Sequence, residues 1–233
     1  IDVLNDKSTL RQNIGYLPQS FGLYPKVSAE MLLDHFAALK GIIDRKERKK
    51  LVNELLDKVN LETHRKKHLG GFSGGMKQRF GIAQALIGNP ALLIVDEPTA
   101  GLDPAERNRF HNVLSEVGQE TIVMLSTHIV EDVKDLCTNM AILNGGQIRL
   151  QGSPATLVAS LNGKVWEKAF DKPEIEAQKQ KYQVISERIF AGQTLIRVCA
   201  DQPPAGDFTA VSPNLEAVYF SQLGLHVKNA ATS

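Results

Sequence analysis

The stretch LLIVDEP, residues 92–98, is the most informative part of the sequence about the fold. Its four consecutive apolar residues indicate a strand that is buried on both faces, as in a parallel sheet covered by helices, because a half-exposed strand would alternate apolar and polar side chains. A second run of this kind spans residues 122–125, and a polar segment of helical character, Pro104 to Val117, separates the two runs. This alternation predicts an α/β fold with a mainly parallel sheet.

The segments around these runs predict further elements. A short strand is expected over residues 13–17, where Pro18 stops it. Apolar residues recur at helix spacing between about residues 20 and 89, which predicts a helical subdomain there. Residues 140–143 and 147–150 flank the sequence Asn-Gly-Gly, which is typical of a β-hairpin.

The C-terminal part of the chain differs in character from the rest. Strands are expected over residues 164–170, 183–189 and 194–200, with a helix over about 173–181 and a last short helix that Pro213 opens. The sequence therefore predicts a domain of residues 1–155, followed by a small α+β accessory domain of residues 156–233.

The bulk properties of the 233-residue chain fit a globular protein, since 42% of its residues are hydrophobic and 23% are charged. Its formal net charge of +1 gives no reason to expect a nucleic-acid partner. Cys137 and Cys199 lack metal-type spacing and are expected to be reduced thiols of a cytoplasmic protein. The longest apolar run, residues 91–95, is far shorter than the ~18 residues that would suggest a membrane span.

The stretch GGFSGGMKQR, residues 70–79, has the features of an anion site. Ser73 is placed to cap a helix that runs from about Gly75 to Ile87. Free N–H groups at a helix start attract negative charge, and glycines let a phosphate approach the backbone. A flexible loop before a capped helix is the alternative interpretation, because glycine-rich caps are common.

Candidate catalytic and metal-binding residues come directly after the predicted strands, where ligands of open α/β sheets bind. Asp96 can hold Mg²⁺ through its water shell, and Glu97 can orient or deprotonate a water that attacks a phosphate. His128 and Gln19 follow two other strands and would face the same crevice if the strands are neighbours. The alternative is that Asp96 caps the next turn and His128 is structural.

Together, these segments resemble one family, the ATP-binding subunits of ABC transporters. The sequence FSGGM, residues 72–76, resembles the ABC signature motif, although leucine is commoner than Phe72 and glutamine is commoner than Met76. LLIVD, residues 92–96, resembles the Walker B strand, and AGLD, residues 100–103, is similar to the D-loop.

The resemblance also assigns roles to single residues. It makes Glu97 the catalytic glutamate, His128 the switch histidine and Gln19 the Q-loop glutamine. It extends over roughly residues 1–155 and implies a P-loop NTPase-type sheet with an ABC helical subdomain over about residues 20–89.

The implied mechanism needs two subunits, which close head to tail around two ATP molecules and Mg²⁺. Each site would take the phosphate loop, the catalytic pair Glu97 and His128, and the Mg²⁺-facing pair Asp96 and Gln19 from one subunit. The other subunit would supply the nucleotide-binding residues Ser73, Gly74, Gly75 and Asp103. The expected partners are a second ATPase subunit and a membrane permease on the cytoplasmic face of the cell membrane. The tail, residues 212–219, is similar to that of multidrug- and lipid-export ATPases, which predicts an exporter.

One part of the family pattern is absent from the sequence. The 233 residues contain no Gly-x-x-x-x-Gly-Lys-Ser/Thr, and the aromatic residue that stacks on adenine is missing too. Residues 1–4 resemble the end of a strand, so we expect a truncation through the phosphate-loop region. The chain as given is then expected to be unable to hydrolyse ATP.

Two other functions remain open at this point. A soluble ABC protein that acts on ribosomes or DNA usually carries two ATPase halves or long coiled-coil insertions, and neither is visible. A regulatory partner that donates only its signature motif would have no need of Glu97 and His128, which are both present.

Overall fold

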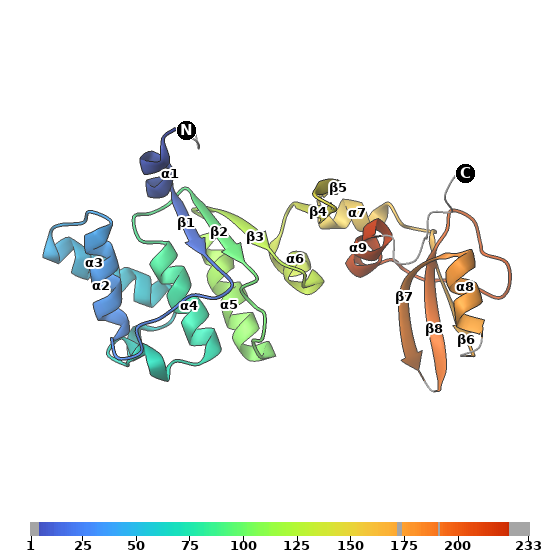
Figure 1. Ribbon diagram of the computed structural model, residues 1–233, viewed down its shortest axis with the longest axis horizontal. Coiled ribbons are helices and arrows are strands. Elements are labelled where there is room, and N and C mark those ends of the chain that lie inside the picture. The colour runs from blue at the N-terminus through green and yellow to red at the C-terminus, as the bar shows by residue number, and fades with distance from the viewer. Residues whose placement is uncertain (1–4, 172–173, 191, 224–233) are drawn as a thin grey trace. The chain divides into compact units, whose positions relative to one another are not determined.

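The computed structural model describes residues 5–171, 174–190 and 192–223 (Figure 1). The chain divides into two compact units, residues 1–132 and 133–233. The strand end predicted at residues 1–4 lies outside the described residues, as does residue 173, where a helix was expected to begin. The border between the compact units precedes residue 155, and the domain border predicted there stays a prediction.

The first unit alternates helices and strands. Its elements are α1 (Lys7–Asn13), β1 (Ile14–Leu17), α2 (Ala29–Leu39), α3 (Arg45–Lys58), the 3-10 turns η1 (Glu62–His64) and η2 (Leu69–Gly71), α4 (Gly74–Ala85), β2 (Leu92–Asp96), α5 (Pro104–Val117), β3 (Ile122–Ser126) and the start of α6 (Val130–Leu136).

The strands of this unit form a parallel sheet in the order β1-β2-β3, which confirms the predicted α/β class. Leu17 pairs with Val95, and Val95 pairs with Leu125, so the three strands reach the same edge in register. The prediction that helices cover both faces is not met in the part of the chain that the structure describes. One face is buried, but Tyr16, Ile122 and Met124 on the other are more than half exposed. An apolar run shows that both faces are hydrophobic, not which elements cover them.

Polar N-caps set where the helices begin. Ser28, Asp44, Ser73 and Asp103 each accept a backbone N–H of the first helical turn, in α2, α3, α4 and α5 respectively. The predicted cap at Ser73 is therefore confirmed, although α4 begins one residue earlier and ends two residues earlier than expected. Helices α2, α3 and α4 pack on one another and account for the predicted helical stretch (Figure 1).

The second unit contains the predicted hairpin and an antiparallel sheet. Its elements after α6 are β4 (Met140–Asn144), β5 (Gln147–Gly152), α7 (Pro154–Ala159), β6 (Val165–Phe170), α8 (Ile175–Lys181), β7 (Gln183–Phe190), β8 (Gln193–Cys199), β9 (Thr209–Ala210) and α9 (Leu215–Leu223). The sheet has the order β7-β8-β6-β9.

Both faces of this sheet are packed. Val184 and Ile185 are neighbours on β7 and point to opposite faces, where they join two separate cores. Ile175 of α8 belongs to the first core and Ala217 of α9 to the second, so the two helices cover opposite faces. The predicted α+β character is confirmed. In residues 5–171, 174–190 and 192–223, no helix is long and apolar enough to span a membrane.

Candidate active site

The carboxyl ends of the three parallel strands bring four predicted site residues to one edge of the sheet. Gln19 lies just after β1, and His128 lies just after β3. Asp96 is the last residue of β2, and Glu97 comes directly after it. Asp96 pairs with Ser126 in the register of β2 and β3, so the two loops leave the sheet side by side. This is the position where open α/β sheets bind ligands.

Glu97 and His128, the predicted catalytic pair, lie in contact. His128 Nδ1 is 2.7 Å from Glu97 Oε2, and the backbone N–H of His128 donates to Glu97 Oε1 over 3.0 Å. The contact is an ion pair when the His128 ring is protonated. The Glu97 side chain is 18% exposed and that of His128 is 67% exposed, which places the imidazole on the solvent side.

The backbone of Glu97 has an unusual conformation. Its φ angle is +45°, in the left-handed region that non-glycine residues seldom adopt. The Glu97 N–H donates to the Ser126 carbonyl over 2.8 Å, which fastens the residue to the end of β3. Residues held in this region cluster at functional sites, because surrounding contacts must offset the conformational cost. The residue with this conformation is the one whose carboxylate contacts His128.

The Asp96 carboxylate is half-buried at the end of β2 and has no hydrogen-bond or ion-pair partner among the described residues. An oxygen donor that is held in place and unpartnered fits a Mg²⁺ ion, which usually keeps several waters and takes few protein ligands. In the part of the chain that the structure describes, no group of three His, Cys, Asp or Glu residues could hold a metal. Gln19 is exposed at the same edge.

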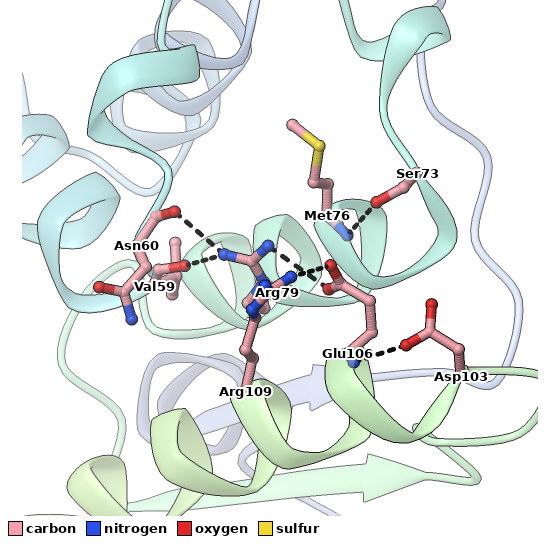
Figure 2. A network of polar contacts seen from close by, with 8 residues as sticks. All are labelled: Val59, Asn60, Ser73, Met76, Arg79, Asp103, Glu106 and Arg109. Atoms are coloured by element: carbon pink, nitrogen blue, oxygen red, sulfur yellow. Dashed lines mark hydrogen bonds and ion pairs between the residues drawn. The ribbon is translucent and has the colours of Figure 1, made fainter.

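The remaining predicted residues lie at the N-termini of α4 and α5 (Figure 2). Ser73 Oγ accepts the Met76 N–H over 3.2 Å, and Asp103 Oδ1 accepts the Glu106 N–H over 2.8 Å. A Cβ on Gly74 would lie 3.6 Å from the Leu102 side chain, so the two helix starts are neighbours. Within the described residues, no hydrogen bond or ion pair joins them to Glu97 or His128. The site residues form two separate groups.

Near these helix starts the structure shows two further polar residues in contact, Arg79 and Glu106, which were not predicted from the sequence (Figure 2). Arg79 is 6% exposed, and its guanidinium donates to the Val59 and Asn60 carbonyls and lies 3.5 Å from Glu106 Oε2. A signal existed for Glu106, since Asp103 and Glu106 have the spacing of a capping box. Its side chain contacts Arg79 and Arg109 instead of the N-cap backbone.

Sequence reasoning also missed Asp132, a fully buried carboxylate on α6. It accepts a hydrogen bond from the Thr99 hydroxyl, lies 2.9 Å from His111 Nε2 and 3.6 Å from Arg107 Nε. Thr99 follows Glu97 by two residues, and Asp132 follows His128 by four. The buried cluster thus connects the loops that carry Glu97 and His128, the predicted catalytic pair, to α5.

Comparison with known proteins found a family model and several relatives that match this chain. The family model described as ABC transporter matches residues 2–100. The chain is 38% identical over 152 residues to an uncharacterised ABC transporter ATP-binding protein, YxlF, of Bacillus subtilis, with 65% of this chain and 51% of the relative covered. It is 35% identical over 154 residues to the linearmycin resistance ATP-binding protein LnrL of Bacillus subtilis, covering 66% and 49% of the two chains.

A third relative, methionine import ATP-binding protein MetN 1 of Pseudomonas putida, is 40% identical over 151 residues, covering 62% of this chain and 44% of the relative. The chain spans about half the length of the curated relatives that it matches. A parallel sheet with polar residues beyond the carboxyl ends of its strands is the arrangement in which open α/β proteins bind their ligands. The chain is similar to the ATP-binding proteins of ABC transporters.

Proposed function

We propose that these residues form most of an ATP-hydrolysing subunit of an ABC transporter. The observation that carries the proposal is the contact between Glu97 and His128 at the carboxyl edge of the sheet, beside the unpartnered Asp96. A structural histidine would be expected to be buried, whereas His128 is mostly exposed and is held by the carboxylate that it contacts.

The proposed chemistry is phosphoryl transfer from ATP to water. A bound Mg²⁺ ion would neutralise developing charge on the phosphates. Asp96 would hold the ion through its water shell, with Gln19 at the same edge. Glu97 would orient the attacking water and accept its proton, and His128 would contact the terminal phosphate in the transition state. The fixed backbone of Glu97 keeps its carboxylate in place for this step.

The separate position of the second group supports a site that is shared between two subunits. We propose that Ser73, Gly74, Gly75 and Asp103 contact a nucleotide bound to a second subunit of the same or a sibling type. The free N–H groups at the start of α4 suit an anionic phosphate. ATP would then hold two subunits together, and hydrolysis would release them.

The further partner in this proposal is a membrane permease, with the subunit bound peripherally on the cytoplasmic face. The helical stretch of α2 to α4 would carry the motion of the dimer to the permease. We propose export as the direction, on the resemblance of residues 212–219 to export ATPases. The name of the relative LnrL includes resistance, which agrees with export, while the name of MetN 1 includes import. ATP-driven uptake of a substrate into inside-out vesicles is expected for an exporter, and ATP-driven loss of substrate from them would indicate an importer.

The 233-residue chain by itself is proposed to lack ATPase activity, because no phosphate-loop motif occurs in it. The backbone N–H groups and the lysine of that loop normally hold the β- and γ-phosphates. The test compares the chain with a chimaera in which a phosphate-loop segment of an ABC relative precedes residue 1. Phosphate release is expected from the chimaera only.

Glu97→Gln in the chimaera is the matched variant, since it keeps the shape of the side chain and removes its basicity. It should bind ATP, hydrolyse it slowly and remain a closed dimer in size-exclusion chromatography with ATP. Wild-type turnover in this variant, or steady phosphate release by the 233-residue chain, would contradict the proposal.

A further inference from the structure

Glu106 contacts both of the helices whose N-termini carry the second group of site residues. It lies in the first turn of α5, and its backbone N–H donates a hydrogen bond to the side chain of Asp103, the N-cap residue of that helix. Its side chain leaves α5 and meets Arg79 of α4 at 3.5 Å, while Arg109 binds its other oxygen at 2.7 Å (Figure 2). The Glu106 side chain is only 14% exposed, so this ion pair is weakly screened.

Gly75 makes the approach of the two helices possible. A Cβ on Gly75 would lie 2.0 Å from Glu106 Oε2, 2.6 Å from its Cδ and 2.8 Å from its Cβ. Real side chains do not approach so closely, so any larger residue at position 75 would push Glu106 or the whole of α5 away. The packing of α4 against α5 therefore requires a glycine at position 75, whether or not a phosphate is bound there.

Arg79 extends the contact to a third element. Its Nη1 donates to the carbonyls of Val59 and Asn60, over 3.1 Å and 3.0 Å, just after the end of α3. Asn60 has a φ of +56°, which turns the chain so that both carbonyls face the same donor. The end of α3, the helix α4 and the start of α5 are thus joined through one buried guanidinium and one carboxylate.

We propose that Glu106 is a positioning residue, which fixes the N-termini of α4 and α5 as one rigid body. Ser73 and Asp103 would then keep a constant spacing, and both would reach a nucleotide on a second subunit in a single movement. Rigid elements that share a buried polar contact transmit motion in this way. The purpose of this rigidity rests on the proposed function, but the rigidity itself can be measured without ATP.

The test measures a distance between the two helices by electron paramagnetic resonance. Spin labels are placed at Lys77 on α4 and Asn108 on α5, both exposed, in the 233-residue chain with Cys137 and Cys199 replaced by serine. One narrow distance distribution is expected for the parent chain. Glu106→Ala should broaden it, because the tie between the helices is lost. Glu116→Ala, at an exposed position of the same helix, is the matched control and should leave it narrow.

A pocket lies beside the ion pair between Glu106 and Arg79. It has a volume of about 390 Å³, and Glu106, Arg79 and Arg109 are among its lining residues. Water can therefore reach the arginines that Glu106→Ala would leave without a carboxylate. The melting temperature of each sample separates broadening from unfolding. If Glu106→Ala unfolds, Glu106→Gln, which retains the size of the side chain, takes its place and should broaden the distribution less.

A second pair of variants tests the close approach of Gly75 and Glu106 by adding a methyl group at position 75. Gly75→Ala should shift the mean distance, and the double variant with Glu106→Ala should shift it less, since most of the clashing atoms are gone. A distribution as narrow in Glu106→Ala as in Glu116→Ala, or a Gly75→Ala shift that does not depend on Glu106, would overturn the inference. Because no nucleotide is present, these results are distinguishable from a failure of the proposed ATPase function.

Discussion

Removal of the Asp132 carboxylate should destabilise the first unit strongly. Asp132→Ala would leave the buried Thr99 hydroxyl and His111, and the partly exposed Arg107, without their shared acceptor. Removing one partner of a buried charged pair costs about 3–5 kcal/mol. The low end applies here, because Arg107 is 3.6 Å from the carboxylate and its side chain is 29% exposed. We expect a loss of about 3 kcal/mol in the free energy of unfolding.

Urea unfolding followed by two probes measures this loss. Trp166 is the single tryptophan and belongs to the second unit, so its fluorescence reports that unit, while far-ultraviolet circular dichroism reports both. With a slope of about 1.5 kcal/mol per molar urea, the midpoint of the first unit should fall by about 2 M. The Trp166 transition should not move.

The control for this experiment is Glu131→Ala, at the exposed neighbouring position, which should change the free energy of unfolding by less than about 0.5 kcal/mol. Equal midpoints for Asp132→Ala and Glu131→Ala would refute the reasoning. So would an equal shift of the Trp166 transition, because the loss would then not be confined to the unit that contains the cluster.

Three further predictions concern single residues. In the chimaera with a phosphate loop, the Ser73→Arg variant should bind ATP but fail to form the closed dimer. When it is mixed with the Glu97→Gln subunit, each dimer should trap at most one nucleotide. Two trapped nucleotides per dimer would place Ser73 away from the interface. His128→Ala should lower turnover roughly 100-fold with a smaller effect on ATP affinity, whereas equal losses of affinity and melting temperature would indicate a structural histidine. Burial, with the Asp201 carboxylate, raises the pKa of the Cys199 thiol, so less thiolate forms at a given pH. Alkylation by iodoacetamide at mildly alkaline pH should be slower in the folded chain than in urea, and equal rates would contradict this.

The sequence predicts the catalytic edge of the sheet because its signals are local. Apolar runs locate β2 and β3, and parallel strands bring their carboxyl ends together, so Glu97 and His128 are expected to be neighbours. The predicted cap at Ser73 is equally local, since its side chain accepts an N–H three residues further on. Such features can be predicted from the sequence without knowledge of the tertiary structure.

Asp132 and Arg79 could not be predicted in this way. Asp132 lies in the polar sequence VEDVKDL of α6, where nothing distinguishes a buried carboxylate from a solvated one. Arg79 is separated from its acceptors at Val59 and Asn60 by about twenty residues of chain. Their burial depends on how separate helices pack, and a charge pattern along one helix does not contain that information.

The left-handed backbone of Glu97 has a consequence for anyone who redesigns this protein. Glycine or asparagine would adopt that φ of +45° with less strain, which suggests a gain of about 1 kcal/mol in stability from replacing the glutamate. A library selected only for thermal tolerance would therefore tend to discard the carboxylate on which the proposed hydrolysis depends. Selection at this position has to reward ATP turnover directly, since the residues that would raise thermal stability there would remove the carboxylate proposed for hydrolysis.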